Sequence, residues 1–349
     1  MKKIFIRSLY VTVLLFIIMG MALGCGNQKS TGEAEKLPGT LTMGTMPMGS
    51  SNNAVGLGIA SVISDNSQME VRVVAMSGPT EYAPMMNSQE IDLGIAATYE
   101  AQMGYLGKDV FEEISNGEGF PFRLVTSGSM NRFGTVVAAD SGIKTGADLA
   151  GKRFVGEITG SANASALQRS ILANQNLTRD DVKWVSVPGV VGAVRAIIEG
   201  RADAAPALYG MAAVQELEAS KGARFLPLDP SPEAMARLQK EYPAFATLVE
   251  PNKDIPGVKE PTYLAGYNNY LIAREDLSDE AVYEIVKALW ENNADLTKIH
   301  VGLRGWVPDK FISVNASLPY HPGAIKYFKE KGVWNSEMDN IQQKLLSQK

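Results

Sequence analysis

The sequence is poor in the residues that most often build metal centres and nucleophilic active sites. It contains one cysteine, Cys25, and two histidines, His300 and His321, among 349 residues. One cysteine cannot form a disulfide within the chain, and no cysteine–histidine spacing of a metal site occurs. No serine, histidine and acidic residue stand in a recognisable nucleophilic motif. We therefore expect no metal, no cofactor and no enzymatic activity.

The chain also lacks a long basic segment. Its net charge is −5, whereas a general nucleic-acid-binding protein needs a positive face, so we expect no nucleic-acid partner. The glycines at Gly44 and Gly49 have the spacing of a phosphate-binding loop, but the lysine that should follow is missing. The 45% hydrophobic and 20% charged content is typical of a globular protein, and the length favours about two domains.

One hydrophobic run, Leu9 to Leu23, stands out near the N-terminus. It follows three basic residues within the first seven positions, which together predict an export signal at residues 1–24. A single membrane-anchor helix is the alternative, although the run is short for a membrane span. The segment Ala22 to Cys25 resembles a bacterial lipobox, which implies that Cys25 is lipidated and anchors an exported protein to a membrane. Residues 25–37 then form a polar tether.

Short apolar segments alternate with amphipathic helical segments along the rest of the chain, which predicts an α/β fold. The clearest helix runs from Ser278, its expected N-cap, to about His300. Two stretches share one order of features: Ile91 to Tyr99 and Ala202 to Tyr209 each contain an aspartate, a strand of small residues and a terminal tyrosine. We interpret this similarity as two similar lobes.

Two further segments predict strands that connect the lobes. Phe133 to Ala138 leaves the first lobe, and Tyr263 to Ile272 returns to it. We therefore predict a discontinuous first lobe, 38–136 plus 267–349, and a second lobe, 137–266. The connecting strands would act as a hinge between lobes that face each other across a cleft.

Several loops that join a predicted strand to a helix are rich in glycine, serine, threonine and asparagine. They are 44–53, 77–80 and 159–163. In open α/β sheets, ligands bind beyond the carboxyl ends of the strands, where helix N-termini suit carboxylates. Helix capping alone also explains serine and asparagine at such positions. The occurrence of this pattern in both lobes favours a ligand-binding cleft between them.

The predicted ligand-binding residues lie in these loops and where the strands end. They are Thr45, Met48, Ser50, Ser51, Asn52, Asn53, Ser77, Gly78, Thr80, Thr98, Tyr99, Thr159, Gly160, Ser161, Ala162, Asn163, Pro188, Tyr209 and Tyr267. Arg132 and Arg169 are weaker candidates for an anion contact, since surface or ion-pair roles also explain them. Methionines near the first loop would give the cleft an apolar side, although most methionines fill protein cores.

These motifs resemble those of the TAXI class of solute-binding proteins, the receptors of tripartite ATP-independent periplasmic (TRAP) transporters. The resemblance covers nearly the whole chain after the export signal. Its most specific segment is Pro319 to Gly332, in which His321 is expected to hold a helix start. Gly94 to Gly104 is similar to the family's Tyr-x-Ala-x-x-Gly element, and Ser141 to Gly156 to an element that many binding proteins share.

The sequence departs from the family pattern mainly where ligands would bind. Asn52 and Asn53 replace tandem tyrosines, and the family's Gly-Ser-Val-Glu-Asn is Gly-Pro-Thr-Glu-Tyr at 78–82. The resemblance therefore implies a two-lobed fold like the type II periplasmic binding proteins and a receptor role, but not the family's ligands.

We hypothesise an extracytoplasmic receptor that binds a small organic anion and delivers it to TRAP membrane permease subunits. The anion would be a carboxylate such as a dicarboxylate, an amino acid or a related organic acid. Three alternatives stay open: the binding lipoprotein of an ABC importer, a ligand sensor for a membrane kinase, and an enzyme on the same fold.

Overall fold

The computed structural model describes residues 37–48, 50–159 and 161–349. The predictions made for residues 1–36, including lipidation of Cys25, and for Gly160 lie outside these residues. Within the described part, no helix is both long and apolar enough to cross a membrane. No group of three or more histidine, cysteine, aspartate or glutamate side chains is arranged to hold a metal ion there.

The first lobe begins with three strand–helix units. Their elements are β1 (Thr40–Thr45), α2 (Ser51–Asn66), β2 (Glu70–Ala75), α3 (Pro79–Asn87), β3 (Leu93–Ala97) and α4 (Thr98–Leu106). The strands are parallel and lie in the order β2-β1-β3. β3 is buried along its whole length, as expected for a strand of small and apolar residues at the centre of a covered sheet.

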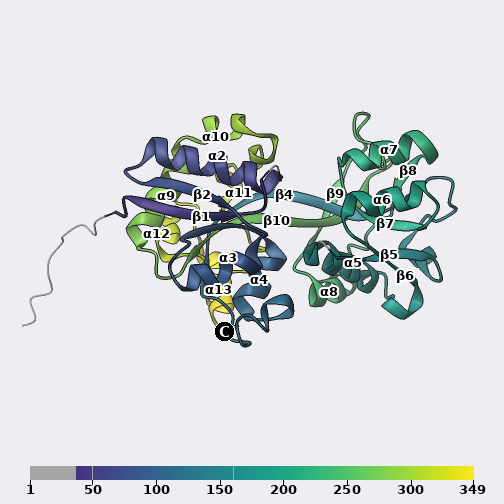
Figure 1. Cartoon of the computed structure of the whole chain (residues 1–349), viewed down its shortest axis with the longest axis horizontal. Coiled ribbons are helices and arrows are strands. Elements are labelled where there is room, and N and C mark those ends of the chain that lie inside the picture. The colour runs from purple at the N-terminus through teal and green to yellow at the C-terminus, as the bar shows by residue number, and fades with distance from the viewer. Residues whose placement is uncertain (1–36, 49, 160) are drawn as a thin grey trace, which may run out of the picture. The chain divides into compact units, whose positions relative to one another are not determined.

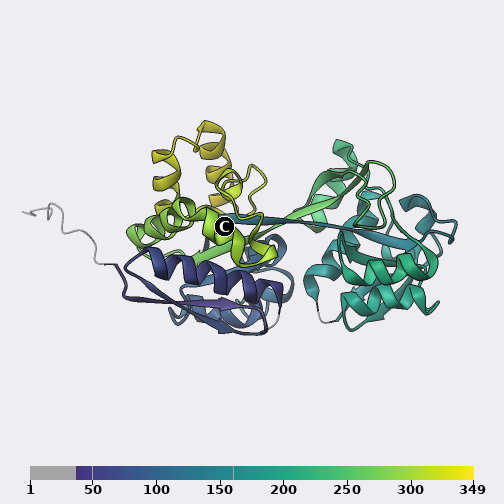
Figure 2. The ribbon, with the colours of Figure 1, turned by 90° about the horizontal axis from the view of Figure 1, so that it is seen from above.

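Two long strands, β4 (Phe122–Ala138) and β10 (Thr262–Arg274), connect the lobes. They pair antiparallel and lie side by side from one lobe to the other (Figures 1 and 2). β10 also pairs with β3 of the first lobe, and β4 pairs with β7 of the second. The boundaries that we predict near residues 136 and 266 fall inside these two strands.

The second lobe repeats the arrangement of the first. Its elements are β5 (Arg153–Ile158), α5 (Ala162–Asn174), β6 (Lys183–Val187), α6 (Val190–Ile198), β7 (Ala204–Leu208), α7 (Ala212–Lys221), β8 (Ala223–Phe225), α8 (Pro232–Glu241) and β9 (Phe245–Val249). The parallel strands lie in the order β6-β5-β7, next to β4. β8 pairs with β4 and β9 pairs with β10.

One aspartate in each lobe supports this internal repeat. Asp92 accepts a hydrogen bond from the Thr42 amide of the first strand at 2.8 Å, and its own amide donates back to Thr42 at 2.9 Å. Asp203 exchanges the same two bonds with Arg153, both at 2.8 Å. Because each aspartate closes the same turn before the third strand, the sequence repeat corresponds to a repeated structure.

The C-terminal helices complete the first lobe. They are α9 (Asp279–Glu291), α10 (Asn293–Ile299), α11 (Pro308–Phe311), α12 (Pro322–Glu330) and α13 (Ser336–Leu346). Short 3-10 turns occur at Asp109–Phe111, Gly146–Leu149, Arg179–Asp181 and Val301–Leu303. Ser278 caps α9 as predicted, but the single helix predicted up to His300 is wrong: it breaks at Asn292, whose backbone is not helical.

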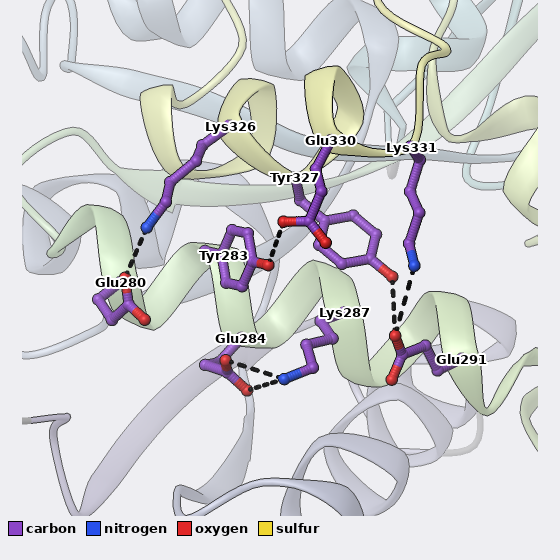
Figure 3. Close-up of polar contacts among 9 residues, drawn as sticks. All are labelled: Glu280, Tyr283, Glu284, Lys287, Glu291, Lys326, Tyr327, Glu330 and Lys331. Atoms are coloured by element: carbon purple, nitrogen blue, oxygen red, sulfur yellow. Dashed lines mark hydrogen bonds and ion pairs between the residues drawn. The ribbon is translucent and has the colours of Figure 1, made fainter.

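Helices α9 and α12 are joined by a row of polar contacts (Figure 3). The Tyr283 hydroxyl donates to Glu330 at 2.5 Å, and Lys326 contacts Glu280 at 2.8 Å while lying over the Tyr283 ring. Beneath them, apolar side chains of both helices lie in the main core of the first lobe. The pairing fixes α12, and therefore the position of its first residues at the sheet.

A separate apolar cluster contains residues of both lobes. It includes Tyr99 and Tyr267 beside Phe133, together with Leu238 and Tyr242 of the second lobe. We call this cluster the hinge core, because β4 and β10 pass through it.

Candidate ligand-binding site

The turn from β1 into α2 uses several of its polar groups to build itself. The Ser50 hydroxyl accepts a hydrogen bond from the Asn53 amide at 3.1 Å, so Ser50 is an N-cap. The Asn53 side chain donates to the Thr45 hydroxyl at 2.9 Å, and both residues are buried. Ser51 is exposed, and Asn52 accepts from the side-chain amide of Asn269 at 3.3 Å. The Ser50 hydroxyl and the side chains of Thr45 and Asn53 therefore serve the turn itself, whereas Ser51 is exposed.

The start of α3 already holds a carboxylate of the protein itself. The backbone amide and the hydroxyl of Ser77 both donate to Glu81 at 2.6 Å, and these bonds lower the pKa of Glu81. Gly78 precedes the helix with a φ of 137°, which only glycine adopts readily, and Thr80 is exposed. The donors of Ser77 are thus occupied.

The predicted tyrosines lie mainly inside the hinge core. Tyr99 stacks on Tyr242 with ring centres 5.0 Å apart, and Tyr267 meets the edge of Tyr242 at 5.8 Å. The Tyr242 hydroxyl donates to the Asn163 side chain at 2.7 Å. Thr98 is also buried, and its hydroxyl donates to the carbonyl of Asn268 at 2.7 Å. Tyr99 and Tyr267 therefore contact Tyr242 of the second lobe, and Thr98 bonds to β10, so these side chains serve packing within the protein.

The second lobe presents a turn equivalent to the first. Ser161 caps α5 by accepting from the Ala164 amide at 3.2 Å, and Ser161 and Ala162 are half-buried. Thr159 and Pro188 are exposed at the ends of β5 and β6.

The remaining candidates lie at different places. Tyr209 is half-buried, and its amide donates to the carbonyl of Arg132 at 2.9 Å. Arg169 is 3.8 Å from Glu241, which agrees with an ion-pair role. Met48 is 84% exposed and therefore packs little against the protein.

Sequence reasoning missed Glu100, which lies in the first turn of α4. Burial raises its pKa to about 7. Burial also raises the pKa of Tyr82, Tyr242 and Tyr267, and the Glu100 carboxylate adds to each of these shifts. An acidic residue in the first turn of a helix is common, because the helix dipole favours it there. Nothing in the sequence therefore indicated that Glu100 is buried.

The segment from His300 to Trp306 is a second feature that sequence reasoning missed. The Ser129 hydroxyl of β4 donates to the carbonyl of Gly302, and a side chain at Gly302 would come within 3.1 Å of the Ser51 hydroxyl. The segment therefore lies beside the start of α2, and its Arg304 is exposed. About 250 residues separate Ser51 from Gly302, so no local signal could have predicted this contact.

A model of the NMT1-like family matches residues 43–332. The chain belongs to the NMT1-like family. This NMT1-like protein also resembles solved structures of low sequence identity. XAC2383 from Xanthomonas citri bound to ATP is 9% identical with a TM-score of 0.53, over 88% of this chain and 99% of that chain.

Two further similar structures are named as binding proteins. A TctC solute-binding protein from Polaromonas is 14% identical, with a TM-score of 0.49 over 89% of this chain and 98% of that chain. The periplasmic aliphatic sulphonate binding protein SsuA from Escherichia coli is 15% identical, with a TM-score of 0.47 over 89% and 86%. The predicted two-lobed α/β fold class is confirmed by the repeated sheet topology together with the likeness to XAC2383.

Proposed function

We propose that this NMT1-like protein is an exported solute-binding receptor for a small organic anion, a carboxylate such as a dicarboxylate, an amino acid or a related organic acid. The family match and the binding proteins among the similar structures support the receptor role. The export signal and the lipobox-like residues before Cys25 support a location outside the cytoplasm.

The observation that carries the anion proposal is the equivalent position of α2 and α5. Each helix directly follows the first strand of a parallel sheet, and each begins at a serine N-cap. The first amides of a helix have no acceptor within it, and the helix dipole makes that end positive. A carboxylate is the ligand group that suits such an end.

The available donors are sufficient for useful affinity. A hydrogen bond to a charged group contributes about 1.5–3 kcal/mol, so four of them reach the roughly 8 kcal/mol of micromolar binding. We assign these contacts to Ser51, Asn52, Ser161 and Ala162 and omit Ser77, because Glu81 already occupies its donors. A ligand that contacts both lobes would favour the closed state, since only differential contact shifts such an equilibrium.

Calorimetry with a panel of dicarboxylates, amino acids and neutral sugars tests the ligand class. We expect at least one anion to bind and Asn52→Asp to weaken its affinity at least tenfold, because the new carboxylate repels it. Gln68→Glu adds the same charge at an exposed position outside the proposed site and is the matched control. Binding of neutral solutes alone, or turnover of the bound molecule, would contradict the proposal.

We further propose that the receptor delivers its ligand to TRAP-type permease subunits. The sequence resemblance to the TAXI class supports this choice over an ABC importer or a sensor kinase. Crosslinking in membranes followed by mass spectrometry tests it: permease subunits without an ATPase are expected. Recovery of an ATP-binding subunit would contradict the proposal and support an ABC importer, and recovery of a kinase would support a sensor.

Lipid anchoring through Cys25 is part of the same proposal. We expect the mature protein to begin at Cys25 with the added mass of a lipid, as measured by intact-protein mass spectrometry. The Cys25→Ala variant should appear in the soluble fraction instead of the membrane fraction, because the acyl chains attached at Cys25 supply the membrane affinity. An unmodified Cys25 would refute the anchor without affecting the ligand proposal.

A further inference from the structure

A hollow of about 440 Å³ in the second lobe is lined by three cationic side chains. Lys144 follows β4, Arg224 belongs to β8, and Lys259 precedes β10. Glu260 is the single acidic residue among the lining residues, so the hollow has a surplus of two positive charges, three minus one. The chain as a whole has a net charge of −5, which makes this concentration of positive charge a local feature.

The fold holds the three cations together. The Arg224 guanidinium donates to the carbonyl of Ile143 at 3.2 Å, and this residue adjoins Lys144. The Phe225 amide donates to the carbonyl of Gly257 at 2.8 Å, which ties β8 to the segment that carries Lys259. Gly257 has a φ of 98°, and a side chain there would come within 2.8 Å of the Phe225 ring. The backbone around the hollow is therefore constrained on two sides.

The three cations lack carboxylate partners among the residues that the structure describes. None lies within 4.0 Å of an aspartate or glutamate oxygen, whereas Arg153, Arg195 and Arg274 all form such pairs. Cations that share a hollow repel one another, and an anion placed between them removes that repulsion. Lys144 and Lys259 are exposed, so their side chains can turn toward such an anion.

We propose that this hollow binds a phosphate group, either on a free anion or on a lipid headgroup. A phosphate dianion balances the two surplus charges, an arginine offers it paired donors, and lysines add point charges. The site is distinct from the strand-end site. Thr262 lines the hollow, and Asn269 lies seven residues further along β10, which corresponds to about 23 Å.

Phosphorus NMR and calorimetry with inorganic phosphate, on the full chain at low salt, test the free-anion form. We expect saturable binding that weakens at least tenfold in the double variant Lys144→Gln/Lys259→Gln. This variant changes only exposed lysines, so folding is retained, and Lys253→Gln on the same segment outside the hollow is the matched control. Arg224→Gln should weaken binding as well, with circular dichroism checking that β8 stays folded.

Sedimentation with vesicles tests the headgroup form, with the same N-terminal segment in every variant. Stronger binding to phosphatidylglycerol vesicles than to phosphatidylcholine vesicles, lost in the double variant, supports a lipid headgroup. Phosphate binding that depends on the two lysines without a vesicle preference supports a free anion. The proposal is overturned if neither probe binds, or if the double variant binds both probes as well as the control does.

Discussion

Glu100 shows at the scale of one residue how packing changes the chemistry of a side chain. Burial raises its pKa from 4.5 to about 7, so the folded protein keeps its proton at a pH where the unfolded chain has lost it. The folded state binds more protons between these two values, and stability therefore falls as the pH rises through this window. Above about pH 7 Glu100 is ionised in the folded protein as well, and the full free-energy cost of its buried charge lowers the stability.

We predict that Glu100→Gln is more stable than the wild type at pH 8 by about 1–3 kcal/mol, and nearly equal to it at pH 4. The neutral amide removes the cost of a buried charge without changing the size of the side chain. Denaturant unfolding at both pH values measures the difference, with Glu118→Gln at an exposed position as the control. The prediction would be contradicted if the free energy of unfolding changed with pH in the same way for the wild type and Glu100→Gln.

Polar residues at the strand ends either stabilise the turns themselves or stay available to a ligand, and sequence alone could not separate these two roles. Ser50 and Ser161 cap helices, and Thr45 and Asn53 bond to each other, so these contacts stabilise the turns. The Ser161 hydroxyl only accepts in its cap, so its own proton is left for the ligand contact that we propose. Capping was the alternative explanation for these residue types, and the structure confirms it for both serines.

At the scale of elements, His321 holds the start of α12. Its ring nitrogen Nδ1 accepts from the Gly323 amide at 3.2 Å, as the motif predicted for a structural histidine. Burial lowers the pKa of His321 below 6.5, although Asp279 opposes this shift. The unfolded chain gains a proton near pH 6.5 before the folded state does, so stability is lost as the pH falls from that value toward the lower folded pKa.

We predict that His321→Asn keeps the cap and reduces the loss of stability between pH 6.5 and 5. His321→Leu should cost about 1–2 kcal/mol at pH 8, because the Gly323 amide loses its acceptor. Thermal unfolding of both variants across this pH range measures the effect. Equal stability of the asparagine and leucine variants at pH 8 would show that the cap contributes nothing.

The break between α9 and α10 is an element boundary that the sequence pattern did not reveal. An apolar stripe from Val282 to Trp290 is the basis on which we predict one long helix up to about His300. In the structure the Asn292 side chain donates to the Ala288 carbonyl at 2.9 Å and the Asn293 side chain donates to Trp306 at 2.5 Å. One local contact and one contact with the His300–Trp306 segment are therefore made at the break between the two helices.

At the scale of the whole molecule, Tyr242 connects the lobes through the hinge core. Its ring stacks on Tyr99 of the first lobe, and its hydroxyl donates to Asn163 of the second. We predict that Tyr242→Leu lowers the free energy of unfolding by about 2–4 kcal/mol, while Tyr242→Phe loses about 1 kcal/mol because the stack remains.

Chemical denaturation of both variants tests this role of Tyr242. Tyr263→Leu is the matched control, because Tyr263 lies on β10 but is 37% exposed. A Tyr242→Leu variant no less stable than Tyr263→Leu would exclude a shared core between the lobes.

The sequence alone determined the features that depend on local pattern. Alternating apolar and helical segments predicted the α/β class, and the matched aspartates of the two lobes predicted the repeat, because periodicity and turn chemistry act over a few residues. Tertiary structure alone decided which polar groups stay available. Glu81 fills the start of α3, Tyr99 and Tyr267 enter the hinge core, and the His300–Trp306 segment lies beside the start of α2. The last two depend on residues far apart in the chain.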